Sequence, residues 1–285
     1  MEPKSESMSE QTLAFIGGGN MAASLIGGLL AGNHDAQNIW VADPDRRKLD
    51  ALHRRFGVNT TPDNLQAVQG AAIIVLAVKP QQLRSVVTGL KNVVSPSHPL
   101  WLTIAAGIRT SDLEAWLGGD TVPIVRAMPN TPALVQAGAT ALFANPHTNP
   151  DQRQAAESVL RAVGLTLWLN DESLMEVVTA LSGSGPAYFF LVMEAMEKAA
   201  IDLGLESNTA RLLTLETAFG AAKMALESEE GCASLRQRVT SPGGTTERAI
   251  VTLEEANIRE AFARALQAAR DRTRELAQEL GNKHA

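Results

Sequence analysis

The sequence is poor in the residues that build covalent and metal-dependent sites. Its 285 residues include one cysteine, Cys232, so no intramolecular disulfide can form, which fits a reducing, cytoplasmic compartment. Its five histidines are scattered, without an H-E-x-x-H pattern, so no metal site is indicated. Ser184 lies in SGSGP rather than in G-x-S-x-G, and we expect a close-packed helix start there, not a nucleophile.

Long apolar runs and excess positive charge are also missing. No apolar run reaches the ~18 residues that a membrane span needs, and the polar, acidic residues 1–10 predict a loose tail rather than a signal peptide. The formal net charge of −6 argues against a nucleic-acid partner. With 45% apolar and 20% charged residues, we expect a soluble globular protein whose partner is a small molecule.

The first half of the chain alternates apolar runs with helical stretches. Five near-continuous apolar runs are typical of strands buried on both faces: 12–16, 38–42, 72–78, 101–105 and 122–128. Two further candidate strands, 139–144 and 165–169, flank a helical stretch at about 150–163. From Asp171 onward apolar residues recur every three or four positions, as in helices. We therefore predict an α/β fold: a Rossmann-type doubly wound sheet over residues 1–170, then an all-α domain over residues 171–285.

A glycine-rich turn follows the first predicted strand and opens a helix. Gly17-x-Gly19-x-x-Ala22 matches the dinucleotide-binding fingerprint with alanine at its third position. The first glycine permits the tight turn, the second lets a pyrophosphate approach the backbone, and the free N–H groups of the helix face the phosphates. The alternative is a merely structural turn. The glycine-rich motif lies at the first strand-to-helix junction, and this position favours cofactor binding.

The end of the second predicted strand bears on the choice between NAD and NADP. Asp43 is placed to accept a hydrogen bond from a ribose 2′-hydroxyl, which favours NAD. Arg46 and Arg47 follow and could hold a 2′-phosphate. Alternatively, Asp43 only caps the next helix, with Pro44 as its first residue. These residues alone leave the choice open.

Other strand ends belong to the same crevice, because ligands of open parallel sheets bind beyond the carboxyl ends of the strands. The small residues at 105–107 would let a flat nicotinamide ring approach. Lys79, in a turn at 77–80, could meet a phosphate or be a solvated loop lysine. The residues at 128–132 hold two prolines, and they form either a rigid turn into the crevice or a plain loop.

Motifs throughout the chain resemble one family, the pyrroline-5-carboxylate reductases. They are FIGGGNMA (15–22), LAVKPQ (76–81), IAAG (104–107), RAMPNTPA (126–133), TALSGSGPAY (179–188), GAAKM (220–224) and VTSPGGTT (239–246). They occur in the family's order and extend over about residues 12–280. Several, especially SGSGPAY and SPGGTT, are specific rather than generic.

The resemblance implies site residues, a cofactor and an assembly. The implied cofactor contacts are Gly17, Gly19, Asn20, Met21, Asn59, Ala77, Val78, Lys79, Pro80, Ala105 and Ala106. Asp43 and Arg46 join them from the residues after the second predicted strand, although members of the family vary where Asp43 stands. The implied substrate contacts are Glu172, Ser241, Gly244, Thr245 and Thr246. Members usually prefer NADPH and many also accept NADH. They form intertwined homodimers through the helical domain, sometimes assembled into decamers.

The reaction that the family catalyses explains the turn at 239–246. Its substrate is a cyclic imine carrying a carboxylate, and one hydride onto the C=N carbon gives proline. Such a reduction needs a fixed ring geometry and a dry face for the nicotinamide. Backbone N–H groups at residues 244–246 would form a nest for the carboxylate, and the Thr246 hydroxyl would bond the ring nitrogen as the catalytic group. The alternative is that Thr245 or Thr246 only caps a helix.

Two other functions fit the same architecture. A β-hydroxyacid dehydrogenase would need a lysine where this chain has Phe189, which cannot carry out acid–base chemistry. A non-catalytic nucleotide-sensing protein would leave SPGGTT without a purpose. We therefore expect an NAD(P)H-dependent reductase of 1-pyrroline-5-carboxylate.

Overall fold

The computed structural model describes residues 11–91, 98–119 and 121–281. The predicted loose tail, residues 1–10, lies outside the described residues. The chain divides into two compact units, of which the first comprises residues 1–184 with 269–285 and the second residues 185–268. The sequence-based boundary at residue 170 instead coincides with the end of the last strand, and as a domain boundary it stays a prediction.

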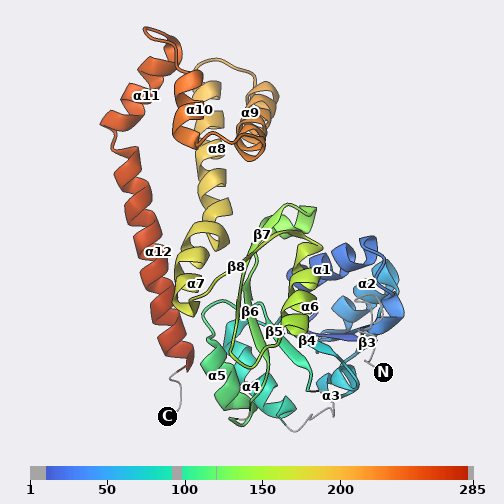
Figure 1. Ribbon diagram of the computed structural model, residues 1–285. Coiled ribbons are helices and arrows are strands. Elements are labelled where there is room, and N and C mark those ends of the chain that lie inside the picture. The colour runs from blue at the N-terminus through green and yellow to red at the C-terminus, as the bar shows by residue number, and fades with distance from the viewer. Residues whose placement is uncertain (1–10, 92–97, 120, 282–285) are drawn as a thin grey trace. The chain divides into compact units, whose positions relative to one another are not determined.

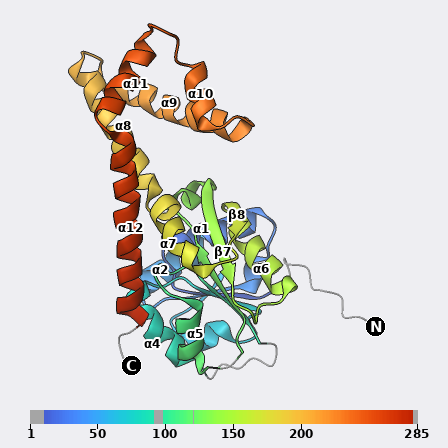
Figure 2. The ribbon, with the colours of Figure 1, turned by 60° about the vertical axis from the view of Figure 1, so that its left-hand side comes forward.

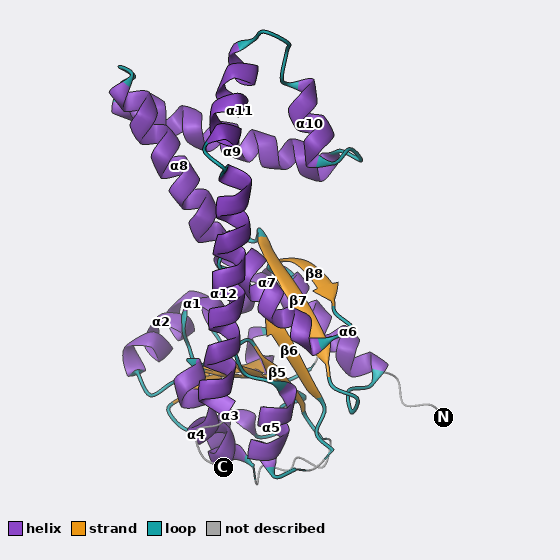
Figure 3. Cartoon of the chain, turned by 90° about the vertical axis from the view of Figure 1, so that its left-hand side faces the viewer, coloured by secondary structure: helices purple, strands orange, loops and turns teal. Residues whose placement is uncertain are grey.

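The first unit is built on one eight-stranded sheet of order β3-β2-β1-β4-β5-β6-β7-β8, drawn in orange in Figure 3. Its strands are β1 (Leu13–Ile16), β2 (Ile39–Ala42), β3 (Asn59–Thr61), β4 (Ile73–Leu76), β5 (Leu100–Thr103), β6 (Ile124–Met128), β7 (Gly138–Ala144) and β8 (Gly164–Trp168). Neighbouring strands are parallel except β6 and β7, which are antiparallel. The order from β3 to β6 is that of a doubly wound dinucleotide-binding sheet, so the predicted fold class is confirmed.

Every strand predicted from an apolar run is present, with bounds within two residues of those expected. The strand that was missed is β3, whose three residues, Asn-Thr-Thr, are polar. It lies at the edge of the sheet and pairs with β2 alone, so it needs no two-sided apolar run.

Two layers of helices cover the sheet (Figure 1). One face carries α1 (Asn20–Ala31), α2 (Arg46–Phe56) and α6 (Pro150–Arg161), and the other α3 (Asn64–Val68), α4 (Pro80–Leu90) and α5 (Thr110–Leu117). Strand β1 shows why the core is double: Leu13 and Phe15 pack into one apolar cluster, Ala14 and Ile16 into the other. Alternate side chains of a strand point to opposite faces, so a run of four apolar residues contributes two side chains to the apolar cluster on each face of the sheet.

Among the described residues after Trp168 there are helices and no strand, which confirms the all-α second part. A short 3-10 helix (Glu172–Leu174) leads into α7 (Met175–Val178) and a π-helical turn (Thr179–Gly183). The helices that follow are α8 (Gly185–Asp202), α9 (Ser207–Glu227), α10 (Cys232–Arg238), α11 (Thr245–Glu255) and α12 (Ile258–Gly281).

The second unit has almost no core of its own. Of residues 185–268, all of them described, only Gly185, Ala210 and Thr214 are buried. Its exposed large apolar side chains include Phe189 (67%), Phe190 (63%), Leu191 (65%), Leu213 (56%), Phe219 (64%) and Met224 (53%). A helical unit with this much open apolar surface is typical of a protein that buries it against another molecule.

One helical stretch of the described residues, 172–202, is long and apolar enough by length and composition to cross a membrane. Only 22% of its apolar window is buried inside the chain, which reflects the same exposed side chains of α8. The absence of a membrane partner stays a prediction.

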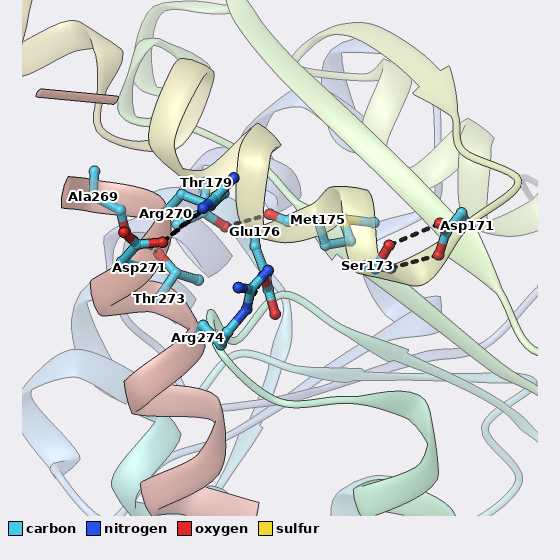
Figure 4. A network of polar contacts seen from close by, with 10 residues as sticks. All are labelled: Asp171, Ser173, Met175, Glu176, Thr179, Ala269, Arg270, Asp271, Thr273 and Arg274. Carbon is cyan, nitrogen blue, oxygen red and sulfur yellow. Dashed lines mark hydrogen bonds and ion pairs between the residues drawn. The ribbon is translucent and has the colours of Figure 1, made fainter. Parts of the chain in front are cut away.

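The C-terminal part of α12 belongs to the first unit and lies next to α5 (Figures 1 and 2). Arg274 on α12 donates from Nε (3.0 Å) and from its terminal nitrogen (2.9 Å) to Oε2 of Glu176 on α7, as Figure 4 shows. Thr273 and Ala277 are buried on the same part of the helix. The last described turns of α12 therefore pack against the first unit.

Candidate active site

The glycine-rich turn lies where three adjacent strands end. Gly17 adopts a φ of 104°, and its N–H donates to the carbonyl oxygen of Ala42 at the end of β2 (2.7 Å). On its other side, a Cβ at Gly17 would lie 2.6 Å from the carbonyl oxygen of Ala77, beyond β4. Only glycine fits this conformation and this space. The first position of the fingerprint is thus fixed by backbone on both sides.

The N-terminus of α1 has no side-chain cap and no acidic residue in its first turn. Its N-cap is Gly19, without a side-chain cap, and its first turn, beginning with exposed Asn20 and half-buried Met21, contains no acidic residue. A Cβ at Gly19 would meet no atom within 4 Å. Free N–H groups at a helix start together with space beside a glycine form a cradle for a pyrophosphate. The residues present therefore fit a dinucleotide cofactor.

Asp43 holds this turn to the loop after β2. Its carboxylate accepts hydrogen bonds from the N–H of Gly18 (2.9 Å) and of Asp45 (2.9 Å), and it pairs with Nζ of Lys48 (3.1 Å). The Asp43 side chain is only 6% exposed. The interpretation that Asp43 caps the next helix is wrong, because the N-cap of α2 is Asp45, which accepts from the N–H of Arg47. Sequence analysis missed Lys48 as the partner of Asp43.

Positive charge is available beside this loop. Arg46 is exposed at the start of α2, and its guanidinium forms no hydrogen bond or ion pair within the described part of the chain. The Arg47 side chain is 93% exposed and lies 3.4 Å from the Asp45 carboxylate. That contact, with the N–H of Arg47, holds the pKa of Asp45 below its ordinary value. An arginine without an intramolecular partner can bind a phosphate.

Two further predicted strand ends meet at the same edge, since β1, β4 and β5 are adjacent. Ala77 donates its N–H to Ile16 (2.8 Å), and half-buried Val78 leads to exposed Lys79, the N-cap of α4, and to Pro80, its first residue. Beyond β5, Ala105 is buried and Ala106 half-buried. The structure thus brings the glycine turn and the turns at 77–80 and 104–107 together.

Asn59 does not join this group, which corrects the prediction for it. It is the first residue of β3, and its side-chain amide donates to the carbonyl oxygens of Gln37 (2.8 Å) and Ile39 (3.4 Å) at the beginning of β2. The crevice lies beyond the other ends of these parallel strands. The polar side chains beyond the carboxyl end of β3 are those of Asp63 and Asn64.

Glu172 belongs to a buried polar cluster of the first unit. Its Oε1 accepts from the backbone N–H of Thr110 (2.8 Å) and from Arg126 (3.0 Å), and its Oε2 accepts from the Thr110 hydroxyl (2.8 Å). Glu172 was predicted as a substrate contact, whereas Thr110 and Arg126 were not predicted. A signal existed for Arg126, since a charged residue inside an apolar strand requires a partner.

The turn at 239–246 lies in the second unit and opens α11. Gly243 has a φ of 71° and donates its N–H to the Glu247 carboxylate (2.7 Å), while Gly244 donates to the carbonyl oxygen of Ser241 (3.0 Å). Gly244 is the N-cap, so Thr245 and Thr246 are the first two helical residues. Neither hydroxyl caps the helix, and the capping interpretation is wrong.

The three hydroxyl groups of this turn are unused within the described part of the chain. Ser241, Thr245 and Thr246 are exposed, and their hydroxyls form no hydrogen bond among the described residues. The N–H groups of the first helical turn have no intrahelical acceptor. Three hydroxyls and the N–H groups at one helix start can receive a carboxylate and a ring nitrogen.

Comparison with known proteins identifies the family. Residues 172–276 match the family model for pyrroline-5-carboxylate reductase dimerisation, and residues 12–107 that for coenzyme F420-dependent NADP oxidoreductases. The chain is 48% identical over 274 residues to pyrroline-5-carboxylate reductase of Pseudomonas aeruginosa, covering 96% of this chain and 100% of that protein. The chain belongs to the pyrroline-5-carboxylate reductase family.

Solved pyrroline-5-carboxylate reductases have the same fold. The enzyme from Coxiella burnetii is 51% identical with a TM-score of 0.89, covering 93% of this chain and 98% of that one. The reductase from Plasmodium falciparum, solved with NADP bound, is 28% identical with a TM-score of 0.85, covering 95% of this chain and 100% of that one. The resemblance stated from sequence motifs is confirmed, in preference to a β-hydroxyacid dehydrogenase or a nucleotide sensor.

Proposed function

We propose that this chain reduces 1-pyrroline-5-carboxylate to L-proline with NAD(P)H, the final step of proline biosynthesis. One observation carries the proposal: a member of the reductase family that covers the whole length of its Pseudomonas aeruginosa relative has both a dinucleotide cradle and a helix start with unused hydroxyls. The first suits the cofactor and the second a small anionic substrate.

The cofactor would be held by backbone at one end and by positive charge at the other. The N–H groups at the start of α1 would bind the pyrophosphate, and Arg46, with Arg47, would bind a 2′-phosphate. Lys79 is exposed at the start of α4 and would meet a phosphate. When bound, the reduced nicotinamide supplies the hydride. Small Ala105 and Ala106 would leave room for its ring.

We expect NADPH to be preferred, with NADH accepted. Arg46 has no partner within the described residues, whereas the Asp43 carboxylate already accepts from two N–H groups and pairs with Lys48. A carboxylate engaged in this way has less capacity left for a ribose 2′-hydroxyl. Both observations favour the phosphorylated cofactor.

The substrate would be held by the turn before α11. The N–H groups of Thr245 and Thr246 would bind its carboxylate, with Gly244 and Ser241 beside them, and the Thr246 hydroxyl would hold the proton on the ring nitrogen. Addition of hydride to the C=N carbon of the protonated imine moves the π electrons onto nitrogen and leaves a neutral secondary amine. The chain's task is to fix the ring and exclude water.

The chain self-associates through a dimerisation domain, and we propose a homodimer in which the nucleotide unit of one chain works with the helical unit of its partner. The near absence of buried residues in 185–268 supports this assembly. The family resemblance extends the proposal to multiples of the dimer, including decamers. We place the enzyme in the cytoplasm, without nucleic-acid or membrane partners.

Turnover assays test the proposed function. Purified protein is mixed with 1-pyrroline-5-carboxylate and NADPH or NADH, and cofactor oxidation is followed with proline formation. We expect proline in equal amount to the cofactor consumed, and no reaction of NADP⁺ with a β-hydroxyacid. Cofactor binding without turnover of the imine would reject the reductase in favour of a sensor.

A further inference from the structure

Glu172 is engaged in a way that leaves it little freedom for a substrate. Three donors approach its two carboxylate oxygens, from the Thr110 backbone, the Thr110 hydroxyl and the Arg126 guanidinium. The side chains of Arg126 and Glu172 are 5% and 21% exposed, and Thr110 is 6% exposed. Hydrogen bonds of a carboxylate to a cation and to a helix N–H are among the stronger ones in proteins.

The partners of Glu172 flank one loop of the cofactor crevice. Arg126 on β6 is the register partner of Thr103, the last residue of β5, and Thr110 is the first residue of α5. Between Thr103 and Thr110 lie residues 104–109, which include Ala105 and Ala106. One carboxylate thus binds Thr110 at one end of this loop and, at the other end, Arg126 on the strand beside Thr103.

Inside the loop, local contacts add to this restraint. The N–H of Ala105 donates to the Thr103 hydroxyl (3.2 Å), so the loop leaves β5 in a fixed direction. Gly107 has a φ of 75°, and a Cβ there would lie 3.7 Å from the backbone nitrogen of Ala277 on α12. The loop therefore lies beside the C-terminal helix, which the Arg274–Glu176 pair connects to α7 (Figure 4).

These two supports act differently. The neighbouring α12 limits the space beside Gly107, and this restraint does not involve Glu172. The Glu172 contacts set where the loop begins and ends, and their loss leaves the buried Arg126 without its carboxylate. We expect the loop to shift slightly when these contacts are lost. A displacement of about 1 Å can lower the rate of hydride transfer strongly, because the nicotinamide must be aligned with the imine.

We propose that Glu172 is a positioning residue: through Thr110 and Arg126 it fixes the 104–109 loop against which the nicotinamide half of the cofactor lies, and it does not bind the substrate. The proposal rests on the proposed function, because that function places the cofactor at Ala105 and Ala106. Arg126 and Thr110 are then positioning residues as well, because Glu172 acts through them.

The test uses the full-length enzyme and the substitution Glu172→Gln, which keeps the shape and removes the charge. We expect kcat to fall about 10–100-fold and the KM for 1-pyrroline-5-carboxylate to change less than about twofold. The Kd for NADPH, titrated without substrate, should rise about 3–10-fold, and the deuterium isotope effect with 4-deuterated NADPH should increase because hydride transfer becomes slower. A role as substrate ligand would instead raise the KM for the imine about tenfold at unchanged NADPH affinity, and would overturn the proposal.

Glu157→Gln is the matched control. The Glu157 side chain is 24% exposed and accepts from Trp168 and Thr166 as well as from Arg161, so it resembles Glu172 in burial and bonding but contacts no residue of the 104–109 loop. Its kcat, its NADPH affinity and its isotope effect should equal those of the parent enzyme.

Thr110→Val keeps the proposal testable if Glu172→Gln does not fold. This change removes one hydroxyl bond to Oε2 and leaves the N–H bond to Oε1. It should change kcat, NADPH affinity and the isotope effect in the same directions as Glu172→Gln, by smaller factors. Where Glu172→Gln does fold, the effects of the two substitutions combined in one chain should be less than additive. Parent-like values in Thr110→Val would overturn the proposal. If the parent enzyme does not reduce the imine at all, the proposed function fails, and the NADPH titrations still decide the role of Glu172.

Discussion

Replacing Gly17 by alanine should damage both stability and cofactor binding. The residue would have to keep a φ of 104° with its Cβ at 2.6 Å from the Ala77 carbonyl oxygen and 3.0 Å from Cγ1 of Val78. The left-handed backbone costs about 1–2 kcal/mol for a residue with a Cβ. Overpacking against a backbone atom costs about 1–3 kcal/mol more, because β1 and β4 cannot separate freely.

The free energy of unfolding should therefore fall by roughly 2–5 kcal/mol, or roughly 4–20 °C in Tm. Shifting the turn also moves the start of α1, so the Kd for NADPH should rise at least about tenfold. Thermal unfolding and fluorescence titration measure the two effects.

Gly19→Ala separates the two effects. A Cβ there meets no protein atom within 4 Å, so the Tm should stay within about 2 °C, while the added methyl group occupies the space where the pyrophosphate approaches and weakens NADPH binding. Gly89→Ala, on α4 and equally free of contacts, is the control and should change neither quantity adversely. Parent-like stability and NADPH affinity in Gly17→Ala would refute the reasoning.

Three further predictions concern the cofactor, the assembly and pH. Arg46→Ala should lower kcat/KM for NADPH about 10-fold and leave that for NADH within about twofold, since an exposed phosphate contact is lost; equal losses would contradict the assignment. Phe219→Glu on α9 should convert dimers into monomers with little activity, measured by light scattering and turnover, because Phe219 is 64% exposed in the single chain; an active dimer would argue against this interface. The indole N–H of Trp168, with Arg161 and Thr166, holds the pKa of Glu157 below 4.5, so its stabilisation is complete above pH 4.5 and is lost as the pH falls through the lower folded-state pKa. The difference in unfolding free energy between the parent and Glu157→Gln should shrink over that acidic range, and a difference that grows on acidification would contradict the assignment.

The sheet could be predicted from sequence wherever a strand is buried on both faces. Strands β1 and β4 are apolar at every position and were found, whereas β3 reads Asn-Thr-Thr and was not. A short edge strand makes contacts on one side only, so its sequence carries a weak signal. The helical half was identified from apolar residues that recur every three or four positions. That pattern does not indicate what covers the apolar faces of the helices.

The site was predictable in its local parts and not in its long-range ones. The glycine turn and the helix start at Thr245 follow from neighbours in sequence. The alternative that Asp43 caps the next helix was wrong because Asp45 is an equally good N-cap, and because the Gly18 N–H that donates to Asp43 is 25 residues away. The Glu172–Thr110 bonds connect residues 62 apart, a pairing that only the folded chain reveals.

The most direct test of the account is the steady-state kinetics of Thr246→Val with 1-pyrroline-5-carboxylate and NADPH. Valine keeps the β-branched shape and removes the hydroxyl, which bonds nothing in the described chain, and the N-cap of α11 is Gly244. We therefore predict an unchanged dimer, a Tm within about 2 °C of the parent and an unchanged Kd for NADPH. We predict that kcat/KM for the imine falls ~10–1000-fold, the ~1.4–4 kcal/mol of a hydrogen bond that strengthens in the transition state. A Thr246→Val enzyme that reduces the imine at the parent rate would contradict the account.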